Sequence, residues 1–195
     1  MNKQYKKFNS TTQIDEWYIQ YKNYFPSDDD KNQNFLKALD LYTSSANVPI
    51  NRLLRSSNKS IEDNRYECFY DIYQNLLPQF STYSIPDNVI VFRYISKSLL
   101  EYMCSSSSPK KGIILEDKGF MSTTLFPDSI NDFLRSRPEL NILLEISVPS
   151  GSKGIYVGHL KNSLTEYEII LAPNTRIRID KKNIFNNHFH CTVVL

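Results

Sequence analysis

The chain has 195 residues, of which 41% are hydrophobic and 23% are charged, and its formal net charge is +2. These values are typical of one globular domain, and the nearly balanced charge gives no indication of nucleic-acid binding. No apolar run approaches the roughly 18 residues of a membrane span, and residues 1–8 lack the apolar centre of a classical signal peptide.

Glycine and cysteine usage exclude further classes of protein. With five glycines, the chain lacks the Gly-rich patterns that bind phosphate in P-loop and dinucleotide-binding folds. Its cysteines, Cys68, Cys104 and Cys191, are odd in number and far apart, as in proteins of a reducing compartment. His188 and His190 have only Cys191 beside them, whereas a closed zinc site takes four ligands, so we expect no metal.

The first half of the chain predicts helices. Apolar residues recur at helical spacing in residues 14–25, 35–46, 50–54 and 66–77. Pro49 is placed to open the third helix, and Ser60 or Asp63 to start the fourth. We interpret each apolar stripe as a surface that packs on the core.

The second half predicts strands, with a polar loop over 105–112 and one short helix over 128–135. The predicted strands are residues 89–92, 119–125, 140–148, 155–157, 167–172, 175–179 and 189–195. Helices followed by strands indicate the α+β class. We see no repeat or linker, so residues 1–195 are expected to form a single domain, mainly helical over 1–80 and β-rich over 86–195.

Three short segments carry polar groups that can do chemistry. Arg93 ends an apolar strand, and Ser122 and Thr124 alternate with apolar residues in another. Residues i and i+2 of a strand point to the same face, so Glu166 and Glu168 are predicted to share one. Taken alone, each segment is also typical of an ordinary solvated strand.

Together, these segments resemble the arginine, Ser-Thr-Ser and Glu-x-Glu signature of the arginine-specific mono-ADP-ribosyltransferases, especially bacterial actin-modifying toxins and effectors. Further similar segments are residues 39–43, 50–55, 148–151, 154–156 and 172–176. The chain departs from the family pattern where Thr124 replaces the second serine and where Tyr94 follows the arginine. The loop over 158–165, where such enzymes meet their protein target, lacks an aromatic residue found in many relatives.

The resemblance implies an ADP-ribosyltransferase fold, in which a helical N-terminal part packs on two facing, mainly antiparallel β-sheets with NAD in the cleft between them. It implies NAD as co-substrate, no metal, and a protein acceptor such as actin or another host protein. We expect a monomeric toxin or effector, secreted or injected into the host cytosol; otherwise the location would be cytoplasmic.

The resemblance also implies roles for individual residues. Glu168 would stabilise the positive charge that develops on the ribose as the nicotinamide bond breaks, and Ser122 would position that carboxylate. Arg93 would bind the pyrophosphate. Glu166 would orient and deprotonate an acceptor arginine, because relatives that modify other side chains tend to carry Gln there.

Three further residues are weaker candidates. Asn51, Tyr94 and Phe133 would contact NAD or line its pocket, with core packing as the alternative for Phe133. Other functions remain open: a NAD glycohydrolase that uses the same site, an inactive binding module that grips a partner through its tyrosines, or a structural α+β protein.

Overall fold

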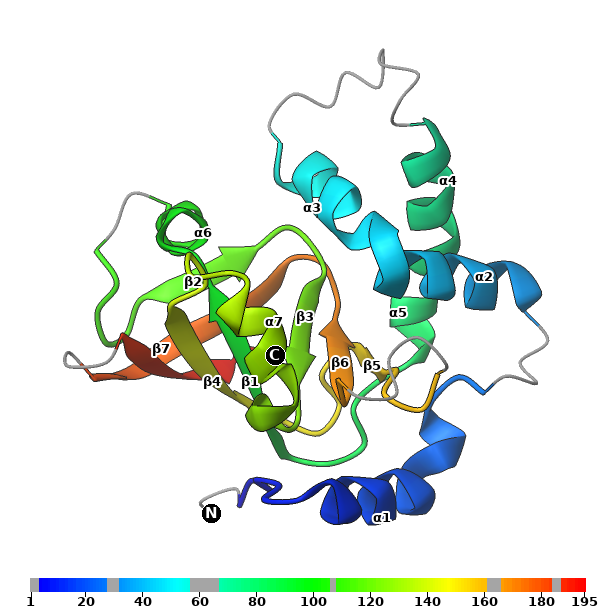
Figure 1. Ribbon diagram of the computed structural model, residues 1–195, viewed down its shortest axis with the longest axis horizontal. Coiled ribbons are helices and arrows are strands. Elements are labelled where there is room, and N and C mark those ends of the chain that lie inside the picture. Colours follow the sequence, from blue (N-terminus) through cyan, green and yellow to red (C-terminus); the bar gives the residue numbers. More distant parts are fainter. Residues whose placement is uncertain (1–3, 28–31, 57–66, 106–107, 161–165, 184–186) are drawn as a thin grey trace.

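The computed structural model describes residues 4–27, 32–56, 67–105, 108–160, 166–183 and 187–195. The α+β class is confirmed, because helices dominate the first part of the chain and strands the second (Figure 1). Within the described residues, no helix is both long enough and apolar enough to cross a membrane. The predicted helix starts, Ser60 and Asp63, lie outside them, as do residues 161–165 of the loop before Glu166.

The first helix, α1 (Thr11–Tyr21), continues into a 3-10 turn, η1 (Lys22–Tyr24). Ser10 caps it, since its hydroxyl accepts a hydrogen bond from the backbone N–H of Gln13. Trp17 is buried beneath the helix and packs edge-on against Tyr156, with ring centroids 5.5 Å apart. Helix α1 therefore lies along the β5 end of the sheet (Figure 1).

One continuous helical run follows where the sequence predicted two helices. It consists of α2 (Gln33–Leu41), a π-helical turn η2 (Tyr42–Ala46) and α3 (Asn47–Arg55). The predicted helix that carries Ile50, Leu53 and Leu54 is present as α3, but it begins at Asn47 and continues from the π turn, so Pro49 lies in its first turn and does not open a separate helix. A proline lacks the N–H that an α-helix needs at an interior position, and the wider π turn just before it accommodates that loss.

The helical part is completed by α4 (Glu67–Leu76) and the short α5 (Gln79–Thr82). Their apolar side chains form one hydrophobic cluster with α2, α3 and the sheet. Its members include Phe35, Leu39, Ile50, Leu76, Phe80, Phe120, Ile155 and Ile170. The helices thus cover one face of the strands that carry Ile155 and Ile170, and of the segment with Phe120 that precedes the next strand.

Eight strands form a mixed sheet in the order β2-β7-β8-β4-β1-β3-β6-β5. They are β1 (Val89–Ile95), β2 (Ile114–Asp117), β3 (Met121–Thr124), β4 (Ile142–Val148), β5 (Gly154–Tyr156), β6 (Glu168–Leu171), β7 (Thr175–Asn183) and β8 (His188–Val193). The described neighbours are antiparallel apart from β4 and β8, which are parallel. Two facing sheets were expected, but the structure has one continuous sheet. The two parts are joined because Phe92 of β1 pairs with Thr124 of β3.

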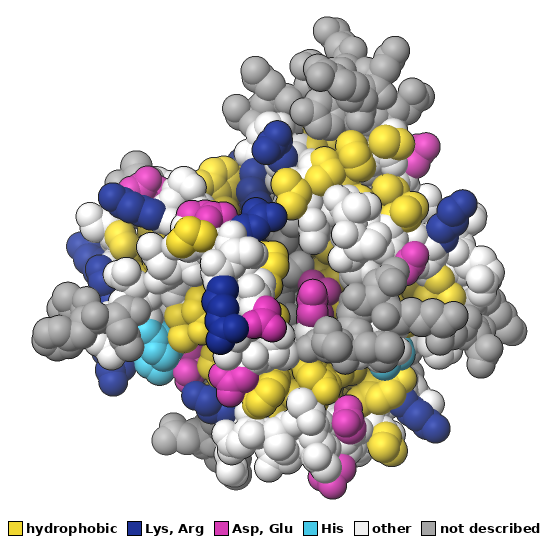
Figure 2. Space-filling view, viewed as in Figure 1, with side chains coloured by type: hydrophobic (Ala, Val, Ile, Leu, Met, Phe, Trp, Pro, Cys, Tyr) yellow, Lys and Arg dark blue, Asp and Glu magenta, His cyan; other side chains and the backbone are white. Residues whose placement is uncertain are grey.

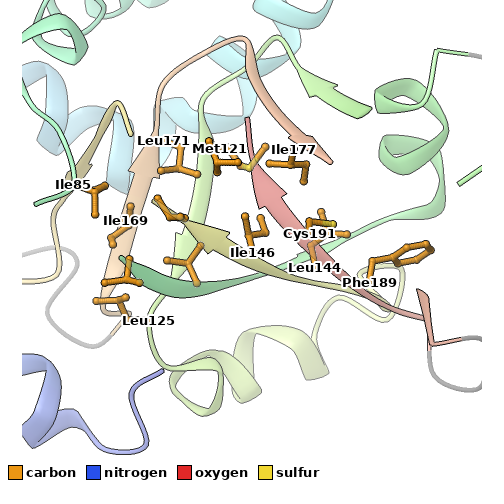
Figure 3. Close-up of a cluster of buried hydrophobic side chains, with 14 of the residues drawn as sticks. Ile85, Met121, Leu125, Leu144, Ile146, Ile169, Leu171, Ile177, Phe189 and Cys191 are labelled. Carbon is orange, nitrogen blue, oxygen red and sulfur yellow. The ribbon is translucent and has the colours of Figure 1, made fainter. Parts of the chain in front are cut away.

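The two halves of this sheet meet across the main core. Figure 3 shows Met121, Ile169 and Leu171 of β3 and β6 gathered with residues of β4, β7 and β8. The latter include Leu144, Ile146, Ile177 and Cys191. Because the halves share this cluster, β3 and β6 bury one face here and turn the other toward the helices.

Several connecting elements complete the fold. The predicted helix over 128–135 is present as a 3-10 turn, η4 (Pro127–Ile130), followed by α7 (Asn131–Arg135). The sequence did not predict α6 (Lys97–Met103) or strand β2. Ser96 caps α6 by accepting a hydrogen bond from the Leu99 backbone N–H.

Candidate active site

Glu168 is a buried carboxyl group at the first position of β6. It lies opposite Thr124 in the antiparallel β3–β6 pair, and Ser122 and Ile170 share its face of the sheet. Glu168 is 8% exposed. The pKa of Glu168 is raised to about 7: burial is the main cause, the Ser122 hydrogen bond opposes it, the charge of Glu166 adds to the rise, and the charge of Arg93 lowers it. The site therefore holds a carboxylate whose charge is poorly solvated, and a nearby cation would stabilise that charge.

Glu166 does not lie on the same strand face as Glu168, so that prediction is wrong. Residues 166 and 167 form a turn, and Tyr167 has a φ of 48°, in the left-handed region. The turn is held by the Thr124 hydroxyl, which donates to the Glu166 carbonyl at 2.6 Å, and by the Leu125 N–H, which donates to the Tyr167 carbonyl. The Glu166 side chain is exposed and still acts on Glu168 through its charge.

Tyr42 connects Glu168 to the helical layer. Its hydroxyl is buried, accepts a hydrogen bond from Asn51 Nδ2 at 3.1 Å, and is hydrogen-bonded to Ser122. Burial and the Glu168 charge both raise the pKa of Tyr42 far above its ordinary value, so the phenol stays neutral. Ser122 thus contacts both Tyr42 and Glu168, which fixes the hydroxyl at the side of the carboxyl group.

Asn51 joins α3 to the segment that precedes β3. Its Oδ1 accepts a hydrogen bond from the Phe120 backbone N–H at 2.8 Å. A Cβ atom at Gly119 would lie 2.6 Å from the same oxygen and 3.1 Å from Arg55 Nε, so this close approach requires glycine. These contacts give Asn51 a structural role, and its contact with NAD stays a prediction.

Two arginines share one buried carboxylate at the end of β2. Arg55 binds Asp117 in a bidentate pair, with both N–O distances 2.8 Å, and Arg93 Nη1 lies 3.1 Å from Asp117 Oδ2. The Gly119 N–H also donates to Asp117 Oδ1 at 2.9 Å. Burial alone would raise the pKa of Asp117, but the charges of Arg93 and Arg55 outweigh it and lower that pKa.

The cluster has an excess of one positive charge, since two guanidinium groups face one carboxylate. The Arg93 side chain is 10% exposed, and its buried Nη1 makes this ionic contact but no well-aligned hydrogen bond among the described residues. In Figure 2, basic side chains gather along the junction between α3 and the strand-rich part of the molecule. A phosphate oxygen would supply both the missing charge and an aligned acceptor.

Tyr94 and Phe133 lie apart from these contacts. Tyr94 is half-buried in β1, one residue after Arg93 and therefore on the opposite strand face, and burial together with the charge of Asp128 raises its pKa. Phe133 is 51% exposed on α7, with the Arg137 guanidinium 5.7 Å from its ring centroid. Core packing is thus the wrong interpretation of Phe133, and contact of either ring with NAD stays a prediction.

Two open hollows of the described structure lie elsewhere. One, of about 560 Å³, is lined by residues 4–8 and α1, and another, of about 320 Å³, by residues of the β6–β7 turn and β8. Neither includes Glu168 or Arg93, so we describe the site by the contacts of its side chains.

Tyr42, Arg55 and Asp117 were not predicted as site residues, although Tyr42 and Arg55 fall in segments that carry the family resemblance. Asp117 offers a usable signal. Leu115 and Asp117 are two residues apart on a short strand and share a face, so both point toward the interior. A carboxylate that faces a core requires a cationic partner.

A mixed sheet covered by helices on one face, with Ser122 and Glu168 on that face and the charge of Arg93 acting on Glu168, defines the class of the ADP-ribosyltransferases. The sequence model of that class described as ADP-ribosyltransferase exoenzyme matches residues 2–194, and the chain belongs to this family.

Known relatives agree with this assignment at low sequence identity. A protein of Enterococcus faecalis, NAD(+)--arginine ADP-ribosyltransferase EFV, is 23% identical over 161 residues, which cover 82% of this chain and 30% of that protein. The chain thus spans less than a third of that relative's length.

Solved structures show the same fold. The ADP-ribosylating toxin BECa of C. perfringens, determined with NADH, has a TM-score of 0.76 at 18% identity, over 98% of this chain and 50% of BECa. An ADP-ribosyltransferase from Clostridium botulinum has a TM-score of 0.69 at 21% identity, over 97% of this chain and 98% of the botulinum chain.

Proposed function

We propose that this protein transfers ADP-ribose from NAD to an arginine side chain of an acceptor protein and releases nicotinamide. The observation that carries the proposal is the buried Glu168 carboxyl group, which is hydrogen-bonded to Ser122 and lies within reach of the Arg93 charge. Family membership supports the transferase reaction, and the name of the E. faecalis relative supports arginine as acceptor.

In the reaction, the bond between the ribose C1′ and the nicotinamide nitrogen breaks, and its electron pair leaves with neutral nicotinamide. The ribose becomes cationic as that bond lengthens, much as in glycoside hydrolysis. Glu168 stabilises this cation electrostatically, and its poor hydration strengthens the effect because little water competes for its charge. Ser122 holds the carboxyl group in place by a hydrogen bond, and Tyr42 is in turn hydrogen-bonded to Ser122.

The acceptor nitrogen then forms a bond with C1′ and loses a proton. A guanidinium is a poor nucleophile while charged, because its pKa exceeds about 12. Glu166 is exposed at the turn before β6, so it can hydrogen-bond an incoming guanidinium and accept that proton. Partial burial of the carboxyl group raises the pKa of Glu166, which makes its carboxylate a better base.

The pyrophosphate of NAD would bind at Arg55 and Arg93. Their single excess charge and the Arg93 Nη1 that lacks an aligned hydrogen bond fit phosphate oxygens, whereas Asp117 keeps both guanidinium groups in place. We further propose that the protein acts as a secreted or injected toxin on a host protein, since the structural relative BECa is described as an ADP-ribosylating toxin.

The test is incubation of the protein with NAD and agmatine, a small guanidine, and separately with a host-cell lysate. The proposal expects ADP-ribosyl agmatine and a protein product heavier by one ADP-ribose unit, both lost with Glu168→Gln. Nicotinamide release without either product would indicate a NAD glycohydrolase, and no NAD turnover would indicate a binding module.

A further inference from the structure

Two histidines of β8 and a glutamate of β4 lie close together on the sheet. Strands β1 and β3 separate β4 from β6, which carries Glu168. Glu145 Oε2 lies 3.5 Å from His188 Nε2, and Glu145 Oε1 lies 3.4 Å from His190 Nδ1. The candidate ligand atoms all lie within 4.8 Å of one another. None of the three residues has a role in the proposed transfer of ADP-ribose.

The parallel pairing of β4 and β8 produces this arrangement. His188 and His190 are two residues apart in β8 and therefore share a face, and Glu145 is the register partner of His190 in β4. Cys191 points the other way, into the core. In the sequence, His188 and His190 have only Cys191 as a neighbour, because the third ligand comes from a strand more than 40 residues earlier.

The distances suit a metal ion. In a tetrahedral zinc site with bonds of about 2.0–2.1 Å, neighbouring ligand atoms are about 3.4 Å apart. In this cluster His188 Nε2 lies 3.5 Å from Glu145 Oε2 and His190 Nδ1 lies 3.4 Å from Glu145 Oε1, so the distances fit an ion that the carboxylate binds through both of its oxygens. In addition, His188 Nε2 is buried and has no hydrogen-bond partner in the described part of the chain, so it is available as a ligand.

A lysine supplies a positive charge for Glu145. Lys7 Nζ lies 3.1 Å from Glu145 Oε2 and 5.2 Å from the Phe92 ring centroid. Lys7 is about half exposed, whereas Glu145 is 14% exposed, so the ammonium group can swing into solvent while the carboxylate stays.

We propose that Glu145, His188 and His190 bind a zinc-like divalent ion in competition with Lys7. Two imidazoles and a carboxylate with an open fourth position form a ligand set that zinc takes in proteins. Binding the ion displaces the Lys7 ammonium group from Glu145.

The test measures Zn²⁺ affinity by titration calorimetry on metal-stripped protein that carries Cys68→Ser, which removes an exposed thiol. One ion should bind per chain, and His188→Ala or Glu145→Gln should weaken the affinity at least about tenfold. Thermal unfolding without metal checks that each variant is folded. Equal affinity in the parent and in folded variants would overturn the site.

Lys7→Met tests the competition. It keeps the packing on Phe92 but removes the charge, so Zn²⁺ should bind about two- to fivefold more tightly, as expected for the loss of an exposed ion pair. Lys182→Met is the matched control, because Lys182 lies 5.3 Å from the Phe189 ring and has no ion pair with Glu145 among the described contacts. Equal affinities for these two variants would overturn the competition with Lys7.

Discussion

Ser122 is hydrogen-bonded to the carboxyl group of Glu168 diagonally across the β3–β6 pair, since its direct register partner is Ile170. This bond lowers the pKa of Glu168 and so opposes the effect of burial, and with both effects present the pKa is raised to about 7. The sheet register thus sets how much of this carboxyl group is ionised near neutral pH.

Ser122→Ala should move the pH dependence of the reaction. Ionised Glu168 is the active form, so kcat/KM should rise with pH through about 7 in the parent. Loss of the hydrogen bond raises the pKa of Glu168 by about one unit, since bonds to charged groups contribute about 1.5 kcal/mol. The check is a pH profile of NAD turnover; an unchanged midpoint would show that the hydroxyl does not act on the carboxylate.

Glu168→Gln should stabilise the protein increasingly as pH rises. The pKa of Glu168 is raised from 4.5 to about 7 in the folded state, so its contribution to folding is fully present below about 4.5 and is lost as pH rises through 7. Glutamine has no such loss, so the variant should gain about 2–3 kcal/mol relative to the parent between pH 5 and pH 8.

Urea unfolding at both pH values measures this gain. Glu116→Gln, which alters an exposed carboxyl group on β2, provides the control. A Glu168→Gln gain that is the same at pH 5 and pH 8 would contradict the raised pKa.

Asp117→Asn should destabilise the fold by about 3–5 kcal/mol, because it leaves two largely buried guanidinium groups without their counter-charge. The matched control is Asp132→Asn. It also removes a 2.8 Å contact with an arginine, Arg135, but both of those side chains are largely exposed, so it should cost less than about 0.5 kcal/mol. Equal losses in urea unfolding would refute the structural role of the arginine–aspartate cluster.

The secondary structure around Glu168 shows what the sequence could predict. Alternation of apolar and polar residues was enough to identify the strands that carry Arg93, Ser122 and Glu168, and the helical stripe identified the segment of Asn51. Alternation assumes that a strand continues, however, and so it placed Glu166 on the Glu168 face. The backbone of Tyr167 takes a positive φ because contacts from Thr124 and Leu125, over 40 residues away, hold the turn.

The arginine–aspartate cluster could not be predicted from local sequence patterns either. Arg55 and Asp117 are 62 residues apart, and their pairing depends on how α3 packs beside β2, which no local pattern encodes. The continuous helix from Gln33 to Arg55 is similar, since its π turn lets the chain pass Pro49 without a break.

Glu166→Gln should separate transfer from hydrolysis. The Glu166 side chain is exposed at the turn, and our proposal gives it no role in binding NAD. The variant should therefore lose arginine transfer more than it loses slow NAD hydrolysis. Both rates come from one assay of nicotinamide release with and without agmatine. If both rates fall by the same factor, Glu166 serves NAD cleavage and not the acceptor.

Glu168 is central to the proposed reaction, and the most direct measurement is the rate of ADP-ribose transfer to agmatine by the parent and by Glu168→Gln at pH 8. Thermal unfolding shows in the same samples that the variant is folded. We predict a loss of about 10²–10³-fold in transfer, with folding intact. Turnover by folded Glu168→Gln close to that of the parent would contradict the catalytic role of this carboxylate.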